Sequence, residues 1–161
     1  MVNIFIYAMQ MEKDGEEYYY QLAEQTNDKG LRAVFSMLAQ EEAKHYEMIS
    51  KARTARPQMA ETSILTDAKN IFAQIKESGE SFDPESGQTD AYKKAQEIEK
   101  RSMDFYQEKA GEVEQDYQKE LFLKLAEEEK KHYFLLQNII DFVSRPETWL
   151  ENAEFCHLEE Y

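Results

Sequence analysis

Six residues of the types that bind metal ions recur in two sets along the chain. Each set holds a lone glutamate followed, thirty residues later, by a Glu-x-x-His pair. The members are Glu12, Glu42 and His45 in the first set and Glu99, Glu129 and His132 in the second. One shift of 87 residues, without a gap, converts the first set into the second. Two lone glutamates and two such pairs are the ligands with which a four-helix bundle binds two iron or manganese ions.

The residues around these positions repeat with the same shift. Examples are Ala8 and Ala95, Lys13 and Lys100, Tyr19 and Tyr106, Phe35 and Phe122, and Leu38 and Leu125. The chain is therefore an internal duplication, and its two halves should fold as two similar pairs of helices.

Apolar residues advance alternately by three and four positions in four segments, a spacing that predicts amphipathic helices. The expected ranges are about 3–26, 29–53, 89–113 and 115–143. The glutamates of both sets interrupt these apolar stripes, and a buried carboxylate is unfavourable unless something neutralises it. Four clustered carboxylates would have to take up protons or bind cations. Two divalent cations give a neutral site, and the histidines add nitrogen ligands on the same helix faces without adding charge.

The sequence alone leaves several interpretations of these residues open. One Glu-x-x-His pair is common in so acidic a chain and often marks only a solvated helix face, whereas two pairs in register with two buried glutamates favour a metal site. Glu41 and Glu128 precede the histidines by four residues and are rival ligands, but they lie off the apolar stripe. Tyr19 and Tyr106 could donate hydrogen bonds to ligand carboxylates or could simply be core aromatics. His157, beside Cys156, is interpreted as a surface residue.

Composition restricts the class of protein. The 161 residues suggest one domain, and the low counts of 5 glycines and 3 prolines favour long helices. A formal charge of −14 argues against nucleic acid or an anionic membrane as a partner. The single cysteine excludes an intramolecular disulfide and any four-cysteine metal site within the chain. With neither a signal peptide nor a membrane span in the pattern, we expect a cytoplasmic protein.

The fold predicted is all-α: a four-helix bundle with a long helical crossover between helices two and three and a short C-terminal helical tail. Residues 1–53 form the first helix pair of this single domain, 54–87 the crossover, 88–143 the second pair and 144–161 the tail. A shorter helix with a Ser or Thr cap is expected within the crossover at SILTDAKNIFAQIKE. Trp149, Leu150 and Phe155 in the tail predict self-association, as a homodimer.

The segments MEKDGEEYY, LAQEEAKHYE, IEKRSMDFY and LAEEEKKHYFLL resemble the rubrerythrin branch of the ferritin-like superfamily over about residues 3–143. The resemblance implies a carboxylate-bridged di-iron centre, with Glu42 and Glu129 bridging the metals and Glu12 and Glu99 as terminal ligands. Rubrerythrins carry an additional carboxylate where this chain has Ser102, which matches Gly15 in the first half. They also commonly carry a rubredoxin domain, for which this sequence lacks the four cysteines. Bacterioferritin shares the symmetric ligand set, but its crossover and tail look different.

We therefore expect two Fe ions, with Mn as an alternative, in a protein that oxidises Fe(II) or reduces hydrogen peroxide in oxidative stress or iron homeostasis. No catalytic residues are expected beyond the metal ligands. Hydrogen peroxide, dioxygen or Fe(II) would be the reactants, and a separate donor such as rubredoxin would supply electrons. Oxygenation of an organic substrate is a second enzymatic hypothesis. The alternative from another class is a non-catalytic metal-binding or structural bundle.

Overall fold

Five helices account for most of the residues that the structure describes. The structure is a computed structural model, and it describes residues 3–55, 62–78 and 88–144. The helices are α1 (Ile4–Gln25), α2 (Lys29–Ala52), α3 (Ile64–Ser78), α4 (Gln88–Lys109) and α5 (Asp116–Ser144), and these ranges contain no strand. The predicted all-α fold is confirmed. The tail with Trp149, Leu150 and Phe155 lies outside the described residues, as do Cys156 and His157.

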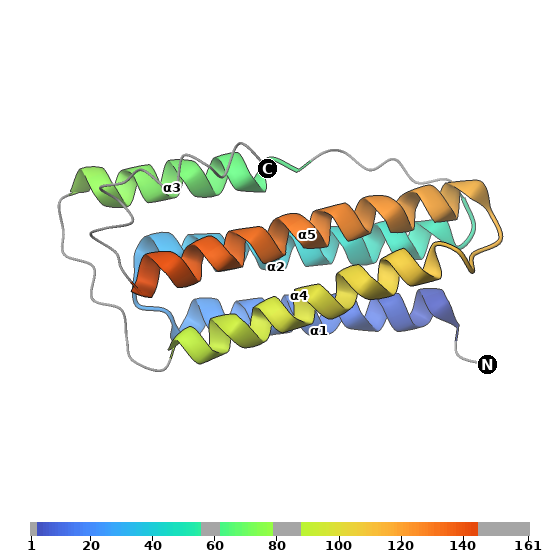
Figure 1. The fold of residues 1–161 in the computed structure, drawn as a ribbon, viewed down its shortest axis with the longest axis horizontal. Coiled ribbons are helices and arrows are strands. Elements are labelled where there is room, and N and C mark those ends of the chain that lie inside the picture. Colours follow the sequence, from blue (N-terminus) through green and yellow to red (C-terminus); the bar gives the residue numbers. More distant parts are fainter. Residues whose placement is uncertain (1–2, 56–61, 79–87, 145–161) are drawn as a thin grey trace.

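Two antiparallel helix pairs, α1 with α2 and α4 with α5, pack into a four-helix bundle (Figure 1). Side-chain caps fix where the first pair begins. Asn3 Oδ1 accepts a hydrogen bond from Phe5 N at 2.9 Å, and Asp28 Oδ1 accepts one from Leu31 N at 2.9 Å. Each cap satisfies a backbone donor that has no partner within the first helical turn. Only residues 26–28 separate α1 from α2, so the two helices must be antiparallel neighbours.

The crossover helix α3 lies outside the bundle, against α2 and α5 (Figure 1). α2 ends at one end of the bundle and α4 begins at the other, so the connection must run the full length of the bundle. Thr62 Oγ1 accepts a hydrogen bond from Ile64 N at 3.2 Å at the start of α3. Ala68 and Phe72 then bury the inner face of the helix, and Phe72 meets the Phe142 ring at 5.3 Å. The helix predicted in the crossover is therefore present and packed.

Helix α4 ends at Lys109, four residues before the predicted end at 113. After Lys109 two backbone bonds span three residues rather than four, from Gly111 N to Glu108 O at 3.3 Å and from Glu112 N to Lys109 O at 3.0 Å, and Val113 N makes a last four-residue bond to Lys109 O at 3.2 Å. Such short bonds tighten and close a helix end. The apolar spacing continues to Val113, but glycine at 111 weakens the helix there. The prediction followed the spacing and missed this turn.

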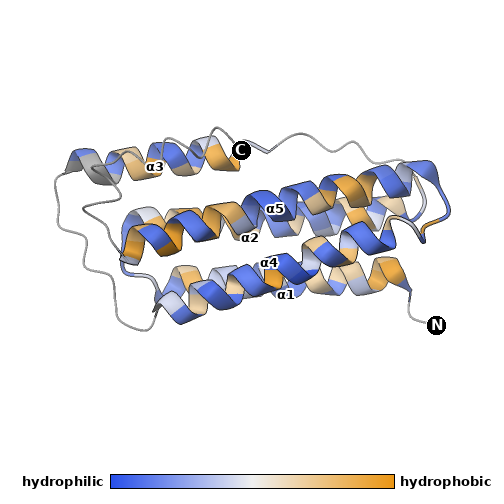
Figure 2. Cartoon of the chain, viewed as in Figure 1, coloured by the Kyte–Doolittle hydropathy of each residue, from blue (hydrophilic) through white to orange (hydrophobic). Residues whose placement is uncertain are grey.

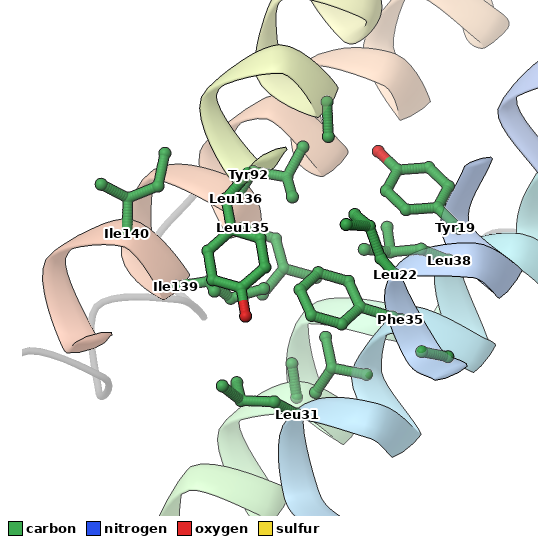
Figure 3. Close-up of a cluster of buried hydrophobic side chains, with 14 of the residues drawn as sticks. Tyr19, Leu22, Leu31, Phe35, Leu38, Tyr92, Leu135, Leu136, Ile139 and Ile140 are labelled. Atoms are coloured by element: carbon green, nitrogen blue, oxygen red, sulfur yellow. The ribbon is translucent and has the colours of Figure 1, made fainter. Parts of the chain in front are cut away.

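Two hydrophobic clusters fill opposite ends of the bundle. The larger cluster contains Leu22, Phe35 and Leu135 and includes the inner face of α3 (Figure 3). The smaller one contains Ala8, Ile49 and Phe122. Figure 2 shows the same division, with hydrophobic residues at the start of α1 and the end of α5 and hydrophilic residues between them. The core is thus interrupted in the middle of the bundle, where the helices carry polar residues.

None of the described helices is both long enough and apolar enough to cross a membrane.

Candidate metal centre

The polar layer between the two hydrophobic clusters contains every metal ligand predicted from the sequence. Each of the four bundle helices carries its glutamate between a residue of one cluster and a residue of the other. The six side chains are almost completely buried, with exposures of 0% to 4%. They are Glu12 on α1, Glu42 and His45 on α2, Glu99 on α4, and Glu129 and His132 on α5. The three-and-four spacing, which puts polar and apolar residues on one helix face, produces this layer.

The six residues form two overlapping groups of potential ligand atoms. In each group, one ligand atom from every member lies within 4.8 Å of the others. Glu42 and Glu129 belong to both groups. The remaining members are Glu12 and His45 in one group and Glu99 and His132 in the other. The two groups thus share two carboxylates, and each adds its own glutamate and histidine. This is the arrangement expected when two carboxylates bridge two metal ions.

Both histidines point one ring nitrogen at the carboxylates. His45 Nδ1 lies 3.0 Å from Glu129 Oε1 and 3.5 Å from Glu12 Oε2. His132 Nδ1 lies 3.1 Å from Glu42 Oε1 and 3.3 Å from Glu99 Oε1. Each imidazole therefore meets the shared glutamate of the other helix pair, which ties the two halves of the chain together.

The two rings lie parallel to each other across the centre of the bundle. The centroids of His45 and His132 are 5.6 Å apart, and their planes differ by 9°. The two Nδ1 atoms therefore face two neighbouring sets of carboxylates, one in each ligand group.

Two buried tyrosines hold the carboxylates that are not shared. Tyr19 on α1 donates a hydrogen bond to Glu99 Oε1 on α4, and Tyr106 on α4 donates one to Glu12 Oε1 on α1. Each phenol reaches the glutamate of the opposite helix rather than the one two turns before it. Burial, reinforced by the neighbouring carboxylates, raises the pKa of both phenols well above the ordinary value of 10.0, so they remain protonated donors.

The pKa values of both shared carboxylates are raised. Burial is the largest cause that raises the pKa of Glu42 and Glu129 well above 4.5, followed by the charge of Glu12. The charge of Glu99 acts in the same direction on both groups. Clustered carboxylates in a dry environment cannot all ionise, so protons take the place of the missing positive charge.

The unshared carboxylates respond in the opposite direction. Burial alone would raise the pKa of Glu12, but the charge of His45 and several hydrogen bonds lower it to about 2. The pKa of Glu99 is lowered in the same way, by His132 and by hydrogen bonds that outweigh its burial. Burial alone would lower the pKa of His45, but the charge and hydrogen bond of Glu12, together with the charges of Glu41 and Glu99, outweigh it and raise the pKa. The layer therefore divides into unshared carboxylates with lowered pKa values and shared carboxylates with raised pKa values.

Unpartnered polar atoms show that the layer fits divalent cations. Among the described residues, Glu12 Oε2, Glu99 Oε2 and Glu129 Oε2 are buried without a hydrogen-bond partner. Buried polar groups are rarely left in that state. Carboxylate oxygens and imidazole nitrogens suit iron or manganese, and two dications would balance four carboxylate charges. The residues present therefore fit a dinuclear metal centre.

Three further residues border this layer. Glu41 and Glu128, which were rival ligands in the sequence, belong to neither overlapping group but form a third group with His45. Gly15 packs against Glu42, since a Cβ at this position would lie 3.4 Å from Glu42 Oε2. Glu128, which the sequence places off the apolar stripe, is nevertheless only 6% exposed. Only the packing of α2 against α5 brings these outer glutamates together.

Comparison with protein families agrees with the geometry of the layer. The family model described as rubrerythrin matches residues 3–140, which include all four bundle helices except the last four residues of α5. No match to the chain was found among curated proteins or among solved structures. The match extends over most of the chain, and the described fold and its buried Glu and His residues are those of a ferritin-like helical bundle with a potential metal site. This chain belongs to the rubrerythrin family.

Proposed function

We propose that the protein is a redox di-iron protein that reduces hydrogen peroxide or oxidises Fe(II), with electrons supplied by a separate donor. The observation that carries the proposal is the pair of overlapping ligand groups that share Glu42 and Glu129. Family membership supports iron as the metal, and manganese is the alternative. The same groups would serve either ion, because both accept oxygen-rich ligand sets.

Each side chain has a defined part in this proposal. Glu42 and Glu129 would serve both metals, Glu12 and His45 would be the further ligands of the first, and Glu99 and His132 those of the second. Tyr106 and Tyr19 fix the terminal carboxylates through hydrogen bonds, and so orient the oxygen atoms that face the metals.

Two bound Fe(II) ions would supply one electron each for the reduction of hydrogen peroxide, with two protons, to two water molecules. The chain provides a buried, charge-balanced layer that holds both ions at fixed positions. Every ligand is at most 4% exposed, which favours a small oxidant over a bulky organic substrate. Because the chain lacks a four-cysteine relay, reduction of the oxidised centre depends on an outside partner such as rubredoxin. A reducing compartment such as the cytoplasm suits this requirement.

Stopped-flow oxidation of anaerobically loaded diferrous protein tests the reaction. We expect hydrogen peroxide to oxidise the protein faster than dioxygen does. Steady-state turnover should be slow with NADH alone and should rise when rubredoxin and its reductase are added. The Glu42→Ala, Glu129→Ala double variant is the control and should show neither reaction.

Two results would contradict the proposal or change it. Purified wild-type protein that binds neither iron nor manganese would favour the non-catalytic bundle. Rapid oxidation by dioxygen with uptake of many irons per chain would instead favour iron storage.

The prediction of a homodimer is part of the proposal and is tested separately. It depends on Trp149, Leu150 and Phe155, and light scattering on the full chain and on a chain ending at Ser144 would examine it. A monomer in both cases would contradict self-association.

A further inference from the structure

A second, outer group of ligand atoms lies next to the dinuclear layer. Glu41 on α2 and Glu128 on α5 approach the His45 ring, and one ligand atom from each of the three residues lies within 4.8 Å of the others. The side chains of Glu41 and Glu128 are 14% and 8% exposed. They are therefore closer to solvent than the side chains of the six inner residues, none of which exceeds 5%.

Two atoms of these three side chains are buried without a hydrogen-bond partner. Among the described residues, Glu128 Oε2 and His45 Nε2 form no hydrogen bond. His45 uses its other nitrogen, Nδ1, for the inner carboxylates. Glu41, Glu128 and His45 thus lie close together, and these two atoms make no hydrogen bond within the group. Ligands that surround one cation at about 2.1 Å are about 3 to 4 Å apart, so the three side chains, whose ligand atoms lie within 4.8 Å of one another, need only a small approach to share a cation.

Lysines compensate the charge of the outer carboxylates. Lys131 Nζ lies 3.0 Å from Glu128 Oε1, and Lys44 Nζ lies 3.5 Å from Glu41 Oε1. The Lys44 side chain is 68% exposed and can turn away from Glu41. A cation that binds here must compete with both ammonium groups, so it binds weakly and leaves readily. Weak, reversible binding is a property of a site of passage rather than of storage.

We propose that Glu41, Glu128 and His45 Nε2 form a transient cation site through which Fe(II) or another divalent cation passes into the dinuclear centre. The inference rests on the proposed function, because it concerns how that same centre is loaded. A cation binds to His45 only in place of a ring proton, and the resulting neutral imidazole offers one lone pair, so His45 serves the outer site only before the inner position that its Nδ1 faces is filled. Loading would therefore begin on the Glu12 and His45 side.

Stopped-flow uptake of Co(II) by the metal-free protein tests the proposal, because cobalt has a visible spectrum and needs no redox reaction. The Glu41→Gln, Glu128→Gln double variant should load at least about tenfold more slowly than wild type, with the same final two ions per chain. The Glu47→Gln, Glu127→Gln double variant is a matched control, since it removes the same charge from exposed positions on the same helices. Equal rates in the outer variant and the wild type, or equal slowing in the control, would overturn the transient site.

Removal of the competing lysine charge should speed up metal loading, and a misfolded variant would not produce that result. Lys131→Gln should load Co(II) several-fold faster than wild type, whereas Lys124→Gln at an exposed position of α5 should not. A Lys131→Gln rate at or below the wild-type rate would count against competition at Glu128. If wild type binds no Co(II) at all, the dinuclear centre itself fails. Normal loading that is insensitive to Glu41, Glu128 and Lys131 refutes only the outer site.

Discussion

The two halves of the duplication supply identical ligands but differ in the residues that surround them. Each half contributes a tyrosine, two glutamates and a histidine to the buried layer, in the same order along the chain. Beside these, Gly15 in the first half corresponds to Ser102 in the second. The outer group of ligand atoms within the described residues includes His45 but not His132. The layer thus tolerates changes in its surroundings while each metal position keeps its carboxylate and imidazole.

The largest expected effect is a difference in metal content between variants of the shared glutamates and variants of the unshared ones. Glu129→Ala should reduce the bound metal from two ions per chain to less than about 0.5, because a bridging carboxylate serves both ions. Glu12→Ala should leave about one ion, held by Glu99 and His132, because only one group loses a member. Elemental analysis after desalting measures both values. Equal loss in the two variants would remove the distinction between bridging and terminal ligands.

In the metal-free protein, substitutions of shared and unshared glutamates should change the thermal stability in opposite directions. Glu129 has a raised pKa in the folded state, so its contribution to stability is complete below about pH 4.5 and is lost as the pH rises through the raised value. Glu12, with its pKa lowered to about 2, contributes above about pH 4.5 and loses that contribution as the pH falls toward 2. At pH 8, Glu129→Gln should therefore raise the apo melting temperature and Glu12→Gln should lower it.

We expect shifts of about 3 to 6 °C, which correspond to about 1 to 2 kcal/mol in a chain of this size. Thermal melts of chelator-treated protein at pH 8 and pH 5 provide the measurement, and the benefit of Glu129→Gln should shrink at pH 5. The holo-protein is the control, because metal binding needs the ionised carboxylate and reverses the sign for Glu129→Gln. A benefit that grows as the pH falls would contradict a neutral Glu129.

Much of the fold and the burial of the six proposed ligands could be predicted because both depend on helical periodicity. Glu12 and Tyr19 are in the apolar stripe of α1, and a residue on that stripe must face the bundle interior. The partner of Tyr19 could not be predicted, since the distance to Glu99 depends on how α1 packs against α4. The proximity of Glu41 and Glu128 has the same origin in the contact of α2 with α5. Periodicity determines which face is buried, whereas packing determines which buried residues meet.

The tyrosines should have equal effects in the two halves. Tyr106→Phe removes the phenol that holds Glu12, and Tyr19→Phe removes the one that holds Glu99. Each variant should weaken binding of one of the two metals by about tenfold, the usual cost of losing a group that orients a ligand. Competition with a chelator measures the affinity. Tyr18→Phe is the control, since Tyr18 donates to the backbone oxygen of Ala91, away from the ligands.

The smallest effects should come from exchanging the residues that differ between the halves. Gly15→Ser places a Cβ 3.4 Å from Glu42 Oε2, which is the short end of ordinary van der Waals contact. The substitution should therefore fit and raise the helix propensity. Ser102→Gly should lose a similar amount, about 0.5 kcal/mol, because glycine is the weaker helix former. The melting temperatures of the apo-proteins should move by about 1 to 2 °C in opposite directions. Metal content should stay at two ions in both variants. If Gly15→Ser lowers metal content while Ser102→Gly does not, then Glu42 needs the space that glycine leaves, and the halves differ in the layer itself as well as around it.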